Sequence, residues 1–239
     1  MIYLRALLGI LFFIAMAWVL SSDRKRFQWR VVAGGILLQL AIAWFILQTS
    51  SGRSFFDGIG SVVSKLVSLT EPGAKMVFGS LGDSGGAAGF IFAFAGTGLV
   101  VIIFFSALMS VLYHLGIMQV AVWALAKVMS ATMGLSGGES MAAAANIFMG
   151  QTEAPLVIRP YIAVLTQSEL LACMTAGFAT TAGGVLAAYV AMLSNFVPGI
   201  AGHLIACSVM CAPGSLVIAK LMMPETEHPT TLDTTPEDV

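Results

Sequence analysis

Charged side chains are scarce in this sequence. Only 10% of its 239 residues are Asp, Glu, Lys or Arg, whereas 58% are hydrophobic. A typical soluble domain has about 25% charged and roughly 45–50% apolar residues, so this chain cannot form a water-soluble surface. Eleven Lys and Arg against twelve Asp and Glu give a net charge of −1, so we expect no nucleic-acid partner. The composition predicts an all-α, polytopic integral membrane protein in a lipid bilayer.

Cysteine and histidine are also rare, with three residues each. Cys173, Cys207 and Cys211 are odd in number and lie in apolar runs, which argues against a disulfide framework. No cluster of His or carboxylate residues completes a tetrahedral metal site around Cys207 and Cys211. The sequence also has no phosphate-binding loop or dinucleotide fingerprint. We therefore expect no bound cofactor.

Several apolar runs are long enough to cross a bilayer, which takes about 20 residues of helix. They cover residues 2–20, 31–47, 90–112, 170–197 and 200–223. Arg24, Lys25, Arg26 and Arg30, between the first two runs, form the densest positive cluster, which the positive-inside rule places in the cytoplasm. The N-terminus is therefore expected outside, and a count of the spans places the C-terminal tail in the cytoplasm.

Other segments are too short or too polar to span. Residues 59–69 are amphipathic and predict a helix along the outer interface, and residues 120–133, interrupted by Lys127, predict a short interfacial helix. The tail has no apolar run and is expected to be disordered. We divide the chain into the first two spans, an interfacial and third-span region, a hairpin, an unwound helix with the last span, and the tail. These units cover residues 1–50, 51–135, 136–168, 169–223 and 224–239.

The predicted hairpin consists of two short apolar segments with a polar tip. Residues 140–150 and 155–165 are eleven residues each, or about 16 Å as helix, which is half a bilayer. The sequence Gln-Thr-Glu-Ala lies between them at 151–154. Paired short segments interrupted by Gly or Pro are typical of re-entrant hairpins, whose tips carry transporter sites near the midplane.

The tip has the residue types of a binding site for a neutral, hydrogen-bonding solute. An intramembrane carboxylate such as Glu153 is costly and therefore suggests a function. Pro155 suits a first helical turn, which would place Glu153 at the start of the second half-helix. Gln151 and Thr152 add donors and acceptors, and Gly150 lets backbone approach a ligand closely. The alternative is an interfacial turn with a solvated Glu.

Residues 180–184, Thr-Thr-Ala-Gly-Gly, interrupt a long apolar run. Glycines in mid-span permit unwinding, and the carbonyls freed in this way can bind a hard cation. The Asn146 side chain and the Met149 carbonyl would supply further oxygen ligands from the hairpin. The alternative is packing of small residues between helices, which needs no ion.

Two other functions fit parts of the sequence. Gly134-Leu-Ser-Gly137 resembles the string of rhomboid intramembrane proteases, with Ser136 as nucleophile and His203 as base. This signal is weak because the pattern has four residues of common types. A membrane fragment that is inactive without a partner is the third alternative.

Four blocks of the sequence resemble the concentrative nucleoside transporters. They are SGGESMAAAANIFMGQTEAPL at 136–156, GFATTAGGV at 177–185, MCAP at 210–213 and PETE at 224–227. Their order and spacing fit this family over nearly the whole chain. The resemblance implies a cation-coupled symporter, driven by sodium or protons, that imports nucleosides and is not an enzyme. It also implies a homotrimer in a bacterial inner membrane.

The family's binding residues carry over onto matching positions. The resemblance implies that the nucleobase contacts Gly150, Gln151, Thr152, Glu153 and Val185. It implies a sodium site formed by the side chains of Asn146 and Thr180 and the carbonyls of Met149 and Thr181. If protons replace sodium, Glu153 is the expected carrier.

Family members continue with further spans, including a second inverted hairpin that recognises the ribose. This chain lacks those blocks, so we expect it to hold the nucleobase-binding first part of an inverted-repeat transporter fold. A truncated reading frame, a separate chain that supplies the C-terminal half, or self-association would each fit this departure.

Overall fold

A computed structural model describes residues 2–79, 98–194 and 196–229, and every regular element in these ranges is helical. The α-helices are α1 (Ile2–Val19), α2 (Trp29–Gln48), α3 (Ser50–Ser68), α4 (Thr70–Phe78), α6 (Leu99–His114), α7 (Ile117–Met133), α8 (Gly137–Asn146), α9 (Ala154–Val157), α10 (Gln167–Ala179), α11 (Gly183–Leu193) and α12 (Ile200–Met222). A 3-10 helix, η3 (Arg159–Val164), follows α9. The prediction of an all-helical membrane protein is confirmed.

Three helical stretches of the described chain are long and apolar enough to cross a membrane. They are α2, the broken stretch formed by α10 and α11, and α12. The 23 residues of α12 extend about 35 Å, slightly more than the hydrocarbon core of a bilayer. In α1 the apolar stretch Leu4–Val19 is shorter.

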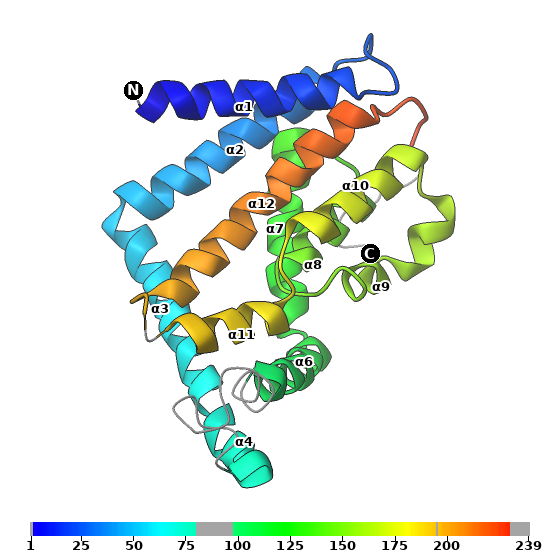
Figure 1. Ribbon diagram of the computed structural model, residues 1–239. Coiled ribbons are helices and arrows are strands. Elements are labelled where there is room, and N and C mark those ends of the chain that lie inside the picture. Colours follow the sequence, from blue (N-terminus) through cyan, green and yellow to red (C-terminus); the bar gives the residue numbers. More distant parts are fainter. Residues whose placement is uncertain (1, 80–97, 195, 230–239) are drawn as a thin grey trace.

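The first arm of the hairpin, α8, lies at the centre of the molecule. All ten of its residues are buried, and it packs against α7, α10 and α12 (Figure 1). Its sequence is rich in alanine, which lets neighbouring helices approach closely. The long helix α12 contacts α2 on one side and α10 on another. The first arm of the hairpin is therefore embedded among α7, α10 and α12 rather than lying at the edge of the fold.

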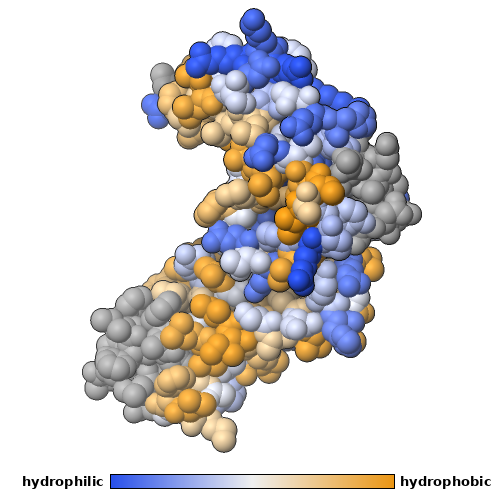
Figure 2. Space-filling model, turned by 90° about the vertical axis from the view of Figure 1, so that its right-hand side faces the viewer, coloured by the Kyte–Doolittle hydropathy of each residue, from blue (hydrophilic) through white to orange (hydrophobic). Residues whose placement is uncertain are grey.

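Charge is concentrated at one end of the molecule. Arg24, Lys25 and Arg26 are exposed in the loop between α1 and α2, and hydrophilic residues gather at this end in Figure 2. The Ser22 amide donates to the Met222 carbonyl at 2.8 Å, so α12 ends at the same place. Elsewhere many large apolar side chains are exposed, as expected for a surface that faces lipid.

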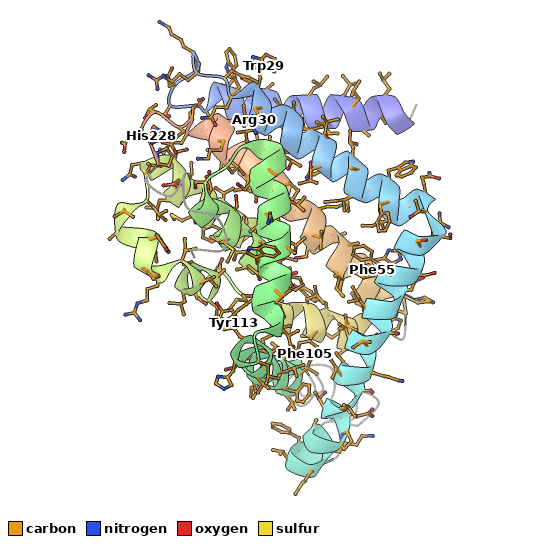
Figure 3. The ribbon with its side chains drawn as sticks, turned by 180° about the vertical axis from the view of Figure 1, so that it is seen from behind. Trp29, Arg30, Phe55, Phe105, Tyr113 and His228 are labelled. Carbon is orange, nitrogen blue, oxygen red and sulfur yellow. The ribbon has the colours of Figure 1, made fainter. Side chains whose placement is uncertain are left out.

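The region before the hairpin differs from the expected span and separate interfacial helix. Helices α6 and α7 meet at an angle of 80° across a short break. Neither is long and apolar enough to cross a membrane alone, but the pair together is. The bend occurs at Gly116, whose φ of 79° favours glycine. Figure 3 shows α7 between Tyr113 at one end and Arg30 at the other. Residues 90–97 of the expected span lie outside the described residues.

The amphipathic segment and the start of the tail also differ from what the sequence predicts. Helix α3 begins at Ser50, well before residue 59. At the start of the tail, a carboxylate oxygen of Glu225 lies 3.2 Å from the ammonium of Lys220. The first residues of the tail are therefore held against α12, and residues 230–239 lie outside the described residues.

Candidate functional site

The hairpin contains one complete α-helical arm and one broken arm. Helix α8 ends at Asn146, a turn covers the tip, and α9 has only four residues before η3 begins at Arg159. The expected eleven-residue second helix is therefore not continuous. Pro160 explains the break, because it disfavours α-helical backbone at the preceding residue and has no N–H to donate to the Leu156 carbonyl.

The predicted unwinding in the long apolar run is confirmed. Helix α10 ends at Ala179 and α11 begins at Gly183, with extended backbone at Thr180 (φ −109°, ψ 153°). The Gly183 amide donates to the Phe148 carbonyl of the hairpin tip at 3.1 Å. A Cβ at Gly183 would lie 2.5 Å from that oxygen, so only glycine permits this approach. The tip and the helix break are thus in direct backbone contact.

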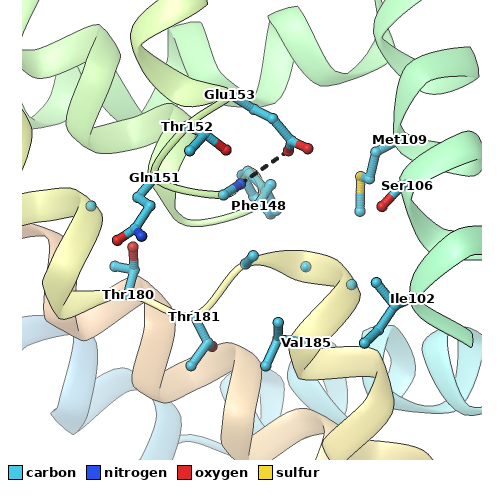
Figure 4. Close-up of a pocket in the computed structure, with 15 residues that line it drawn as sticks. Ile102, Ser106, Met109, Phe148, Gln151, Thr152, Glu153, Thr180, Thr181 and Val185 are labelled. Atoms are coloured by element: carbon cyan, nitrogen blue, oxygen red, sulfur yellow. Dashed lines mark hydrogen bonds between the residues drawn. The ribbon is translucent and has the colours of Figure 1, made fainter. Parts of the chain in front are cut away.

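A cavity of about 430 Å³ lies between the tip, the helix break and α6 (Figure 4). Predicted nucleobase and sodium residues that line it are Gly150, Gln151, Thr152, Glu153, Thr180, Thr181 and Val185. The structure therefore brings the polar tip to the unwound segment, although 26 residues and three helical segments separate Glu153 from Thr180 in sequence.

The polar groups of the tip face this cavity. A carboxylate oxygen of Glu153 accepts a hydrogen bond from the Gly150 amide at 3.1 Å, and this bond closes the turn (Figure 4). Gln151 lies opposite Thr180 in the same view. The side chains of Gln151, Thr152 and Glu153 are all exposed. They therefore offer amide, hydroxyl and carboxylate groups to a ligand in the cavity.

Asn146 lies behind the cavity, at the end of α8. It is 1% exposed, and neither its Oδ1 nor its Nδ2 has a hydrogen-bond partner. An unpaired buried polar group costs about 1–3 kcal/mol, so this amide is poorly explained by folding alone. A Cβ at Gly177 of α10 would lie 3.7 Å from Oδ1. The hydroxyl of Thr180, at the end of α10, donates to the Ala176 carbonyl at 3.0 Å, so its oxygen lone pairs stay available.

Several residues of the cavity wall are not among the sequence candidates. Ile102, Ser106 and Met109 come from α6, Phe148 from the tip and Gly177 from α10. In sequence, α6 is an apolar run that resembles any lipid-facing helix. Of the three α6 residues that line the cavity, Ser106 alone is polar. A single serine in an apolar run is a weak indication of a binding site.

The protease alternative is wrong. Ser136 is fully buried as the N-cap of α8, and its hydroxyl donates to a carboxylate oxygen of Glu169 at 2.5 Å. Glu139, three residues on, contacts Lys220 near the end of α12, whereas His203 lies near the start of that helix. These two positions on α12 are about 25 Å apart. Ser136 and His203 therefore cannot act on one substrate bond.

Two family models match the chain. One describes the N-terminus of Na+ dependent nucleoside transporters and covers residues 8–81. The other describes nucleoside recognition and covers residues 95–196. The second match includes the hairpin, the helix break and the part of α6 that lines the cavity.

Similar proteins include transporters from distant organisms. An uncharacterized transporter of Haemophilus influenzae is 46% identical over 98% of this chain, which covers 54% of that protein. Solute carrier family 28 member 3 of Homo sapiens is 43% identical over 92% of this chain, which covers 30% of it. Sodium/nucleoside cotransporter 1 of Rattus norvegicus is 42% identical over 92% of this chain, which covers 32% of that cotransporter.

Solved structures show the same fold. CNTnw in an inward-facing substrate-bound state matches with a TM-score of 0.87 and 44% identity, over 96% of this chain and 55% of that one. An outward-facing CNTnw structure gives a TM-score of 0.86 over 95% of this chain and 53% of that one. The chain thus spans about a third to a half of the length of these relatives. With both family models, this likeness shows that the chain belongs to the concentrative nucleoside transporter family, a family of transporters and not of enzymes.

Proposed function

We propose that this chain forms the nucleobase-binding part of a sodium-coupled nucleoside symporter. The observation that carries the proposal is the polar tip at the helix break, with the unpartnered amide of Asn146 buried beside it. Membership of a family that contains sodium-dependent nucleoside transporters supports it. The cavity volume of about 430 Å³ falls within the range of small-molecule sites, roughly 300–1,000 Å³.

The tip residues suit the edge of a nucleobase. A base presents N–H donors beside carbonyl or ring-nitrogen acceptors, and the Gln151 amide can pair with both kinds of group. The Glu153 carboxylate accepts from a base N–H, and the Thr152 hydroxyl donates or accepts. Val185 adds an apolar contact from α11, and Gly150 keeps the tip backbone close to the ligand. These groups discriminate a hydrogen-bonding base from an apolar solute.

Sodium would bind between the hairpin and the break. The oxygen of the Asn146 side chain, the Thr180 hydroxyl and the carbonyls of Met149 and Thr181 form the proposed ligand set, which matches a hard cation. A bound ion would tie the tip to the break and hold residues 150–153 in place for the base. Sodium would then raise nucleoside affinity, and nucleoside would raise sodium affinity by the same factor.

We further propose a trimer in a bacterial inner membrane, with the N-terminus outside. The basic loop between α1 and α2 lies at the same end of the molecule as the end of α12, which supports a cytoplasmic C-terminal side. The relatives are longer than this chain, and we propose that the remainder of the transporter, from the same protein or a separate chain, completes the ribose site.

The test is uptake of labelled uridine and adenosine by cells that lack their own nucleoside transporters. Cells would express the chain alone, or with the C-terminal half of a relative, in NaCl or in choline chloride. We expect sodium-dependent uptake that Glu153→Gln abolishes. If uptake is equal in the two salts and follows pH instead, sodium coupling is wrong and Glu153 becomes the expected proton carrier.

A further inference from the structure

A buried charged cluster lies at the base of the hairpin, far from the cavity. It consists of Glu139, Glu169, Lys220 and Glu225, and we call it the basal cluster. The ammonium of Lys220 lies 2.8 Å from a carboxylate oxygen of Glu139 and 3.2 Å from one of Glu225. Glu139, Glu169 and Lys220 are at most 3% exposed. Buried charges of this kind need close partners, and here Lys220 bridges two of the acids.

The basal cluster joins the starts of two helices. Ser136 and Glu139 form a capping box at the start of α8, and Thr166 and Glu169 form a second one at the start of α10. The Ser136 hydroxyl donates to a carboxylate oxygen of Glu169, so one capping box is hydrogen-bonded to the other. The two helices therefore begin at one shared point.

Lys220 and Glu225 attach this shared point to α12 and to the chain that follows it. Lys220 also donates to the Ser168 hydroxyl at 3.0 Å, and the Ser168 hydroxyl donates to the Met223 carbonyl at 2.7 Å. The Thr166 hydroxyl donates to a carboxylate oxygen of Glu225 at 2.8 Å. Lys220 thus contacts Glu139 at the base of α8, Ser168 at the base of α10 and Glu225 after α12.

The same two helices also end together, at the proposed sodium site. Asn146 is the last residue of α8, and Thr180 directly follows α10. The helices contact each other and have ten and thirteen residues, or about 15–20 Å. Helices this short are rigid, so a shift at their bases changes the spacing of Asn146 and Thr180.

We propose that Lys220 is a positioning residue for the sodium site, and this inference rests on the function proposed above. Lys220 pairs with the Glu139 carboxylate at the base of α8 and donates to the Ser168 hydroxyl at the base of α10, and so fixes the distance between the two helices that carry the proposed ion ligands. Without its charge the buried carboxylates repel one another, and the bases of the helices move apart. The ion ligands at the other ends then lose their spacing, although no atom of the ion site has changed.

The experiment measures sodium binding by thermal stabilisation of the purified chain. Melting temperature is recorded over a range of NaCl concentrations, with choline chloride keeping the ionic strength constant, and the sodium concentration that gives half of the stabilisation is the readout. We expect Lys220→Met to raise this concentration at least tenfold. Lys220→Arg, which keeps the charge, should stay within about threefold of the parent chain. Lys65→Met, which removes an exposed lysine of α3, is the matched control and should equal the parent chain.

Glu225→Gln is a milder variant for the case that Lys220→Met does not fold. The Glu225 side chain is 14% exposed, and its loss leaves the Lys220–Glu139 pair intact. It removes one of the contacts that hold the Lys220 ammonium in place and the contact with Thr166 at the base of α10, so we expect a smaller shift in the same direction. If Lys220 has only a structural role, Lys220→Met will lower the melting temperature in choline chloride without changing the sodium concentration that gives half of the stabilisation. That result overturns the inference. If the parent chain itself shows no stabilisation by sodium, the sodium site is wrong and the inference fails with it.

Discussion

The contact between Gly183 and the hairpin tip gives the sharpest prediction. In Gly183→Ala, the new Cβ would lie 2.5 Å from the Phe148 carbonyl oxygen, whereas real Cβ atoms essentially never come within 3.0 Å of a neighbour. The tip and α11 must separate by at least about 0.5 Å, which stretches the hydrogen bond between the Gly183 amide and Phe148 from 3.1 Å beyond bonding range. Overpacking costs about 1–3 kcal/mol and the lost hydrogen bond about 1 kcal/mol. We expect a loss of at least roughly 2 kcal/mol, and a melting temperature about 4–8 °C lower.

The assay is thermal unfolding of the purified variant in detergent, combined with equilibrium binding of labelled uridine. The control is Gly9→Ala in α1, where a Cβ meets nothing within 4 Å. Alanine is the better helix former by about 1 kcal/mol, so this control should melt at the same temperature or higher. We also expect uridine affinity to fall at least about tenfold in Gly183→Ala only, because the tip carries the base-binding groups. If both alanine variants behave alike, the close contact of tip and break is wrong.

Three further predictions concern the site and the base of the hairpin. Glu153→Gln should weaken uridine binding at least about tenfold without lowering the melting temperature, because this side chain is exposed and accepts a single hydrogen bond from the described residues, from the Gly150 amide. Unchanged affinity would argue against a carboxylate–base contact. Asn146→Ala should abolish stabilisation by sodium. Its melting temperature in choline chloride should stay within a few degrees of the parent chain, because the unpaired amide contributes no hydrogen bond. Normal stabilisation by sodium would remove Asn146 from the ligand set. Ser136→Ala should cost about 1–3 kcal/mol of stability through the lost cap and buried hydrogen bond. Neither this variant nor the parent chain should react with a fluorophosphonate probe. If the probe labels the parent chain but not the variant, the protease hypothesis is restored.

The sequence predicts the parts of the fold that depend on apolar length and on polar interruptions. The break at residues 180–182 follows from Thr and Gly residues inside an apolar run, and α10 and α11 flank it as expected. The polar tip follows from two segments too short to span. Pro160 also limits the second arm of the hairpin, but its effect competes with an apolar pattern that favours a continuous helix.

The long-range arrangement could not be predicted from these patterns. Ser106 and Met109 reach the cavity because α6 and α7 bend by 80°, and the sequence does not determine which face of α6 then meets the tip. Lys220 and Glu139 lie 81 positions apart and pair only because α12 and α8 end and begin at one place. A lone lysine near the end of an apolar helix is usually interfacial, so its burial had no local signal.

The central claim is that the hairpin tip and the helix break bind a nucleoside together with sodium. Equilibrium binding of labelled uridine and adenosine to the purified chain, in NaCl and in choline chloride at equal ionic strength and pH, tests this claim most directly. The account predicts that at least one nucleoside binds more tightly in NaCl and that this difference disappears in Asn146→Ala. Equal affinity for both nucleosides in the two salts would contradict the coupling of the two sites.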